Sequence, residues 1–183
     1  MLSQDSNCSP GCDFLLSWRG ALAAMFGVAV LALGTVLIAQ YGFGFAPCVL
    51  CLWQRIPYFF VLALAGVGFA PGLRRWRGAL LVGCGLLLLI ACGIAIFHVG
   101  VEQHWWLGTT GCSIQASATP AHDTKSLRAM LLATPVAQCD QITWTLLGLS
   151  MATWNVFFAL TMGLYALYVV FMGRPDGAEA EEK

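Results

Sequence analysis

Long apolar runs separated by short polar stretches dominate the chain. No charged residue lies between Gly20 and Gln54, and the runs Ala79 to Phe97 and Gln141 to Gly173 are also free of charge. A shorter apolar run extends from Ile56 to Ala70. Because a membrane-spanning helix needs about 20 mainly apolar residues, this pattern predicts four transmembrane helices. We expect them at about residues 20–40, 52–70, 79–99 and 149–172.

The segments between these runs predict one short and one long loop. Glycine, proline and aromatic residues interrupt the pattern between 41 and 47, which ends the first helix at a membrane interface. The short loop then covers about 41–51 and the long loop about 100–148. Within the long loop, residues 125–132 are briefly amphipathic, which is typical either of a helix on the membrane surface or of an ordinary loop helix.

Positive charges predict how the chain crosses the membrane. The stretch Pro71 to Gly78 contains three arginines, and cytoplasmic loops are enriched in Lys and Arg. Both termini then lie in the cytoplasm, and both predicted loops lie on the opposite side. This topology places six of the nine Lys and Arg residues inside: Arg19, Arg74, Arg75, Arg77, Arg174 and Lys183.

Composition agrees with an all-α membrane bundle. The chain has 183 residues, of which 59% are hydrophobic and only 10% charged, whereas a soluble domain has about 25% charged residues. Its length suits a single membrane domain over 1–183. A formal net charge of zero gives no indication of a nucleic-acid partner.

Four of the eight cysteines fall in the two predicted outer loops. Cys48 and Cys51 form a C-x-x-C pair just before the second helix, and Cys112 and Cys139 lie in the long loop. The arginine-rich loop thus places all four in a compartment where disulfides persist. Two dithiols on one membrane face can pass electrons by thiol–disulfide exchange.

We interpret the other four cysteines as bystanders. Cys8 and Cys12 lie on the cytoplasmic tail, where thiols stay reduced. Cys84 and Cys92 lie within the third apolar run, where a buried cysteine packs as a small hydrophobic residue.

A dithiol that turns over needs an electron acceptor. The chain has no nucleotide-binding glycine pattern, and Leu52 follows Cys51 where a haem attachment site would need histidine. A lipid-soluble quinone remains as the acceptor available to a membrane helix. Arg55, one helical turn after Cys51, and His98, at the outer end of the third helix, are candidate donors to its carbonyl oxygens. His98 is also a candidate proton relay.

Other interpretations of these residues remain open. The four outer cysteines are also a possible ligand set for structural zinc, although they lack a second closely spaced pair. Both pairs are also compatible with structural disulfides in a membrane scaffold without catalytic activity. An alternative role for Arg55 is to extend its guanidinium group to the lipid headgroups.

The motifs C-V-L-C-x-x-Q-R after the first helix and H-x-x-x-E-Q at the end of the third, followed by two loop cysteines, resemble the DsbB family. The resemblance covers about residues 20–172, and in the second loop it rests mainly on the cysteines. It implies a multi-pass protein of the bacterial inner membrane that oxidises a periplasmic, thioredoxin-like DsbA protein and reduces ubiquinone or menaquinone.

The resemblance also assigns roles to individual residues. Cys112 would form the mixed disulfide with the DsbA-like partner, and electrons would pass from Cys112 and Cys139 to Cys48 and Cys51, then to quinone. Cys51 would lie beside the quinone.

Arg55 and His98 match the residues of that family that contact the quinone. Glu102 and Gln103 either cap the third helix or line the pocket. A quinone enzyme similar to vitamin K epoxide reductase is the alternative within this chemistry, although its C-x-x-C lies on the last helix.

Overall fold

A computed structural model describes residues 14–108, 139 and 145–173. Helices dominate these residues, and the elements are α2 (Trp18–Gly42), α3 (Val49–Val67), the 3-10 helix η1 (Pro71–Trp76), α4 (Arg77–Glu102), β1 (Thr145–Leu146), β2 (Leu149–Ser150) and α6 (Met151–Met172). The amphipathic segment 125–132 lies outside the described residues.

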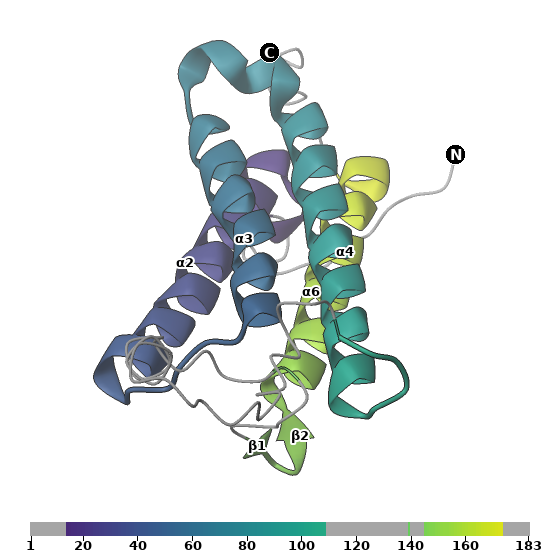
Figure 1. Ribbon diagram of the computed structural model, residues 1–183. Coiled ribbons are helices and arrows are strands. Elements are labelled where there is room, and N and C mark those ends of the chain that lie inside the picture. The colour runs from purple at the N-terminus through teal and green to yellow at the C-terminus, as the bar shows by residue number, and fades with distance from the viewer. Residues whose placement is uncertain (1–13, 109–138, 140–144, 174–183) are drawn as a thin grey trace, which may run out of the picture.

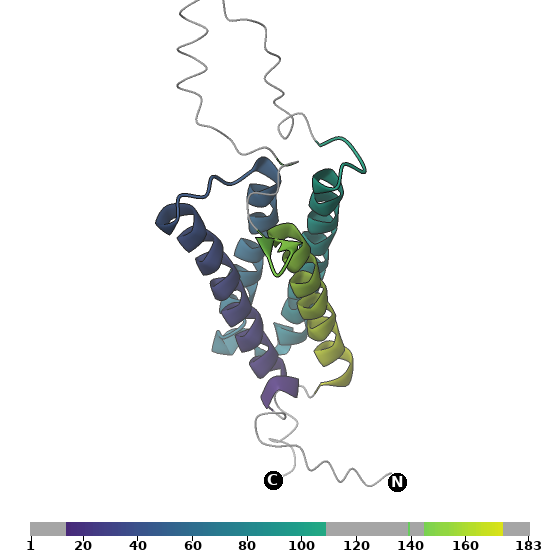
Figure 2. The ribbon, with the colours of Figure 1, turned by 90° about the horizontal axis from the view of Figure 1, so that it is seen from below.

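The four long helices form an antiparallel bundle with two distinct ends (Figure 1). We call one the η1 end, because η1 lies there with the start of α2 and the end of α6. We call the other the hairpin end, where the connection from α2 to α3, the end of α4 and the hairpin of β1 and β2 lie. Figure 2 shows the same division from below, with the hairpin between the helix ends. α4 makes its most extensive contact with α6, and α3 packs between α2 and α4.

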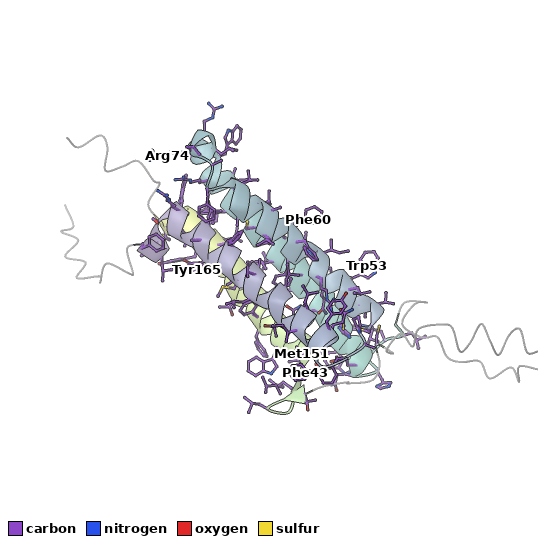
Figure 3. The ribbon with its side chains drawn as sticks, turned by 90° about the vertical axis from the view of Figure 1, so that its left-hand side faces the viewer. Phe43, Trp53, Phe60, Arg74, Met151 and Tyr165 are labelled. Atoms are coloured by element: carbon purple, nitrogen blue, oxygen red, sulfur yellow. The ribbon has the colours of Figure 1, made fainter. Side chains whose placement is uncertain are left out.

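All four helices are long and apolar enough to cross a membrane. Large apolar side chains cover the outside of the bundle, and Trp53 and Phe60 point away from it in Figure 3. In water such a surface would be a liability, whereas lipid is its natural environment. The predicted four-helix membrane bundle is therefore confirmed.

Polar side chains fix the helix starts. Ser17 caps α2 by accepting a hydrogen bond from the Gly20 N–H, and Ser150 caps α6 by accepting one from the Thr153 N–H. α3 starts at Val49, three residues earlier than the expected start at Leu52, because Cys48 serves as its N-cap. Cys51 therefore lies inside the first helical turn and not in the loop before it.

The main core of the bundle is made of small and aliphatic side chains. Cys84 and Cys92 are buried in it, as expected of apolar fillers, and the Cys92 thiol lies 3.7 Å from the Val156 carbonyl oxygen. α4 and α6 approach closely where Gly85 faces Gly163, since a Cβ at either glycine would lie 3.2 Å from the carbonyl oxygen of the other. Small residues at such crossings are the usual means by which membrane helices pack tightly.

Three arginines gather at the η1 end. Arg74 and Arg75 are exposed, and Arg74 extends beyond the bundle in Figure 3. Arg77 is buried and donates from Nε to the Gly68 carbonyl oxygen at 3.0 Å, which links the end of α3 to the start of α4. Positive charge is therefore concentrated at the end opposite the C-x-x-C pair.

Candidate redox site

The C-x-x-C pair occupies the first turn of α3 at the hairpin end. The sulfur atoms of Cys48 and Cys51 lie 2.7 Å apart, with the Cys48 thiol donating to Cys51. The Cys48 sulfur also accepts a hydrogen bond from the Cys51 backbone N–H at 3.1 Å. The two sulfurs are thus placed for reversible bond formation without movement of the helix.

Hydrogen bonding makes the two thiols unequal. The hydrogen bond from Cys48 to Cys51, and then burial, raise the pKa of the Cys48 thiol well above its usual range. Cys48 therefore retains its proton near neutral pH and directs it to the Cys51 sulfur. The Cys48 sulfur thus takes part in two hydrogen bonds: it accepts one from the Cys51 backbone N–H, and its thiol donates one to the Cys51 sulfur.

His98 approaches the same pair from α4. It is only 4% exposed, and its Nε2 lies 3.6 Å from the Cys48 sulfur and 3.7 Å from Glu102 Oε1. Its other nitrogen, Nδ1, lies 3.0 Å from Gln54 Nε2 on α3. The imidazole is thus held between α3 and the end of α4, beside the cysteine pair. The role of His98 as a quinone donor stays a prediction.

A line of buried and half-buried polar groups continues from Gln54 into the bundle. The Asn155 amide on α6 donates to Gln54 Oε1 at 3.1 Å, and the Tyr58 hydroxyl donates to Asn155 Oδ1 at 2.6 Å. On the other side of His98, the buried Glu102 carboxylate accepts a hydrogen bond from Ser150. Three helices therefore contribute to one hydrogen-bonded network around the cysteine pair.

Arg55 faces a different helix. Its Nη1 donates to Gln40 Oε1 on α2 at 2.6 Å, and its Nε is buried without a hydrogen-bond partner among the described residues. No hydrogen bond joins Arg55 to His98 within this part of the chain. The two predicted quinone donors thus have different neighbours: Arg55 contacts α2, and His98 belongs to α4. The Nε–H of Arg55 is unsatisfied among the described residues.

The structure also brings one loop cysteine to this site. Cys139 is 1% exposed and packs in a small cluster with Cys48, Leu50 and Val101. Cys51 also packs against this cluster, so Cys139 lies beside the C-x-x-C pair. Cys112, Cys8 and Cys12 lie outside the described residues.

Metal binding would use a different set of ligands from the one considered in the sequence. Cys48, Cys51 and His98 place one potential ligand atom each within 4.8 Å of one another. Two thiolates and an imidazole suit soft metals such as zinc. The buried Glu102 lies beside this group, whereas the exposed Gln103 forms the C-cap of α4.

Sequence patterns gave weak signals for several site residues. Gln54 belongs to the quoted motif, but nothing indicated that it contacts His98. Asn155 and Ser150 interrupt an apolar run, and a polar residue inside such a run is itself a signal of an internal contact. Gln40 gave no comparable signal, because it lies at the predicted end of the first helix, and Tyr58 gave none, because tyrosine is enriched at membrane interfaces.

Comparison with known proteins agrees with this geometry. The family profile described as "Disulfide bond formation protein DsbB" matches residues 18–169. Disulfide bond formation protein B of Polaromonas sp. is 30% identical over 82% of this chain and 88% of its own length. Disulfide bond formation protein B 2 of Pseudomonas syringae pv. syringae is 31% identical over 80% of this chain and 87% of its own length. Since the profile covers most of the chain, the chain belongs to the DsbB family of disulfide bond formation proteins, which act as thiol oxidoreductases.

Proposed function

We propose that this protein oxidises a periplasmic, thioredoxin-like dithiol protein of the DsbA type in a reaction that depends on quinone. Electrons pass from the partner to Cys112 and Cys139, and then to Cys48 and Cys51. The observation that carries this proposal is the placement of Cys139 in one buried cluster with Cys48, whose sulfur lies 2.7 Å from that of Cys51.

Transfer between the two cysteine pairs is a thiol–disulfide exchange. The reduced partner attacks Cys112, which breaks the disulfide between Cys112 and Cys139 and releases a Cys139 thiolate. That thiolate attacks Cys48, so that a bond between Cys139 and Cys48 forms while Cys51 leaves as a thiolate. The partner's second thiol then frees Cys112 as a thiolate, which attacks Cys139 and restores the loop disulfide. The Cys48 and Cys51 pair is left reduced by two electrons.

The donors around Cys51 fit a quinone. The buried Nε of Arg55 needs an acceptor, and a quinone carbonyl oxygen would supply one. His98 is less available as a donor, because both of its ring nitrogens face described residues. The cofactor, ubiquinone or menaquinone, would take up the two electrons and two protons of the reduced pair when bound.

The charge distribution supports a location in the bacterial inner membrane. Positive charge is concentrated at the η1 end, which would then face the cytoplasm together with both termini. The hairpin end with the cysteine pair would face the periplasm, where disulfides persist.

Quinone reduction by purified protein in detergent tests this proposal, with a reduced thioredoxin-like periplasmic protein as the electron donor. The wild type should turn over. Cys51→Ser should not, while it retains the thermal unfolding midpoint of the wild type, because serine cannot form the disulfide. Turnover of Cys51→Ser, or none in the wild type, would contradict the proposal.

Two further results distinguish the alternatives. In a scaffold with structural disulfides, Cys51→Ser would lower stability and the wild type would show no quinone reduction. If a metal held by Cys48, Cys51 and His98 carried the activity, a chelator would abolish turnover. The proposed relay should be unaffected by the chelator.

A further inference from the structure

We propose that Tyr58, through Asn155 and Gln54, holds neutral His98 in the tautomer with its proton on Nε2, so that His98 donates a hydrogen bond to the Cys48 sulfur. These three residues are positioning residues, since none of them contacts either sulfur. The inference concerns the same site as the proposed function. It rests on that function only where it gives Cys48 a role in thiol–disulfide exchange.

The two amides can adopt only two combined orientations. Gln54 and Asn155 contact each other through one amide oxygen and one NH2 group. Turning over one amide alone would bring two oxygens or two NH2 groups together and would lose that hydrogen bond. Both amides must therefore turn together, and each joint orientation specifies which His98 tautomer fits against Gln54.

Tyr58 distinguishes the two orientations. In the observed one, its hydroxyl donates to Asn155 Oδ1. In the reversed one, Asn155 would present its NH2 group, and the Tyr58 hydroxyl hydrogen would lack an acceptor among the described residues. Tyr58 is only 4% exposed, so an unsatisfied hydroxyl there is costly. The observed orientation places the Gln54 NH2 group against His98 Nδ1, which must then be a bare acceptor.

The opposite side of the imidazole leads to the same tautomer. His98 Nε2 faces the Cys48 sulfur and Glu102 Oε1. The Cys48 thiol hydrogen is directed to Cys51, so Cys48 presents only lone pairs to His98. A proton on Nε2 can be donated to the Cys48 sulfur, whereas a bare Nε2 would face both groups with its own lone pair. Both sides of the ring therefore require a proton on Nε2.

This tautomer gives His98 a defined role. When Cys112 attacks Cys139, Cys48 leaves with negative charge on its sulfur, and a hydrogen bond from His98 Nε2 stabilises that charge. No proton is transferred, because Nδ1 is occupied by Gln54 and Nε2 keeps its hydrogen. His98 acts here as a fixed donor, which differs from the proton relay expected from the sequence.

The tautomer can be observed directly by ¹⁵N NMR of the reduced, full-length protein in detergent, because the two neutral forms of histidine give distinct nitrogen shifts. The chain has three histidines, and the His98→Gln spectrum identifies the resonances of His98 by their absence. The wild type should carry the proton on Nε2. A proton on Nδ1 in the wild type would overturn the inference.

Two variants test the chain of amides. Gln54→Glu presents only acceptor oxygens, so His98 should acquire a proton on Nδ1. Tyr58→Phe removes the hydroxyl that fixes the orientation, so the ratio of Nε2–H to Nδ1–H forms should fall by about threefold to tenfold, the worth of one neutral hydrogen bond. Tyr58→Phe keeps the inference testable even if the glutamate variant does not fold.

Tyr165→Phe is the matched control. Its hydroxyl donates to the Leu15 carbonyl oxygen, and Figure 3 shows Tyr165 far from Trp53, toward the other end of the bundle. The control should leave the His98 spectrum unchanged. An unchanged spectrum in Tyr58→Phe would overturn the inference. Because the spectra need neither quinone nor partner protein, absent turnover in the wild type would count against the proposed function alone.

Discussion

At the scale of single residues, Arg55 combines a satisfied and an unsatisfied donor. Its Nη1 is held by Gln40, which fixes the direction of the guanidinium, while its Nε is buried without a partner among the described residues. A planar guanidinium offers several donors in fixed directions, which lysine cannot reproduce. The Nε–H of Arg55 is therefore available to donate to a bound carbonyl oxygen, while Nη1 stays hydrogen-bonded to α2.

Replacement of Arg55 by methionine should weaken quinone use. The lost interaction is a hydrogen bond from a charged donor, so we expect the KM for quinone to rise by about tenfold to 100-fold. Steady-state quinone reduction in detergent measures this change. A single round of disulfide exchange with the partner protein should keep its wild-type rate. Unchanged quinone kinetics would remove Arg55 from the proposed site.

Arg75→Met provides a control for loss of charge alone. Arg75 is exposed at the η1 end, and its guanidinium lies 5.6 Å from the ring centre of Trp76. Its replacement should leave the KM for quinone unchanged.

The predictability of the site differed from residue to residue. The spacing of Cys48, Cys51 and Arg55 is local, so one helix was enough to place them together. His98 was predicted as a donor to a quinone, whereas its 3.6 Å approach to the Cys48 sulfur depends on how α4 packs against α3. Contacts of Gln54 with Asn155 depend on how two helices distant in the sequence rotate against each other, and local patterns carry no information on that rotation.

At the scale of helices, the crossing of α4 and α6 depends on glycine. Gly85 and Gly163 bring the two backbones together, and a Cβ at 163 would also lie 3.1 Å from the Leu89 side chain. Asn155 lies on the same helix α6, and Ser150 is its N-cap. The position of that helix against α4 therefore also sets the network around His98.

Gly163→Val should force α4 and α6 apart. We expect a loss of about 1–3 kcal/mol, because added atoms meet a backbone that has little room to yield. The fall in the thermal unfolding midpoint in detergent measures it.

Gly93→Val is the matched control for this substitution. It lies in α4 with no atom within 4 Å of an added Cβ, and it should be neutral or slightly stabilising. Equal effects of the two substitutions would contradict the crossing described here.

Helix positions were largely predictable, whereas their ends were less so. Lengths and apolar composition identified all four helices, but the start of α3 depends on a sulfur cap. The hairpin of β1 and β2 was missed. Its two turn residues, Leu147 and Gly148, both have positive φ, of 54° and 79°, and the leucine is an unusual choice for such a turn.

At the scale of the whole molecule, charge and chemistry lie at opposite ends. Arg74 and Arg75 are exposed at the η1 end, and the cysteine network lies at the hairpin end. The distribution of positive charge normally sets the orientation of membrane helices. The positive charge at the η1 end would therefore both orient the protein and place its cysteine network on the oxidising side of the membrane.

Reporter fusions test this orientation in intact cells. A green fluorescent protein attached to the C-terminus of the full chain should fluoresce, because that end is expected in the cytoplasm. Alkaline phosphatase, which is active only outside the cytoplasm, should be inactive at the same position and active when inserted after Leu147. The reverse pattern would show that the arginine-rich end faces outward.

The N-cap of α3 has a practical consequence for any mutational study of this protein. The atom that caps the helix is also the atom that reacts, since the Cys48 sulfur accepts the Cys51 backbone N–H. Serine at position 48 keeps an oxygen that can accept this hydrogen, and serine is among the best N-cap residues. Alanine removes the acceptor and destabilises the helix start by about 1 kcal/mol. Comparison of the two replacements would separate loss of sulfur chemistry from loss of the helix cap.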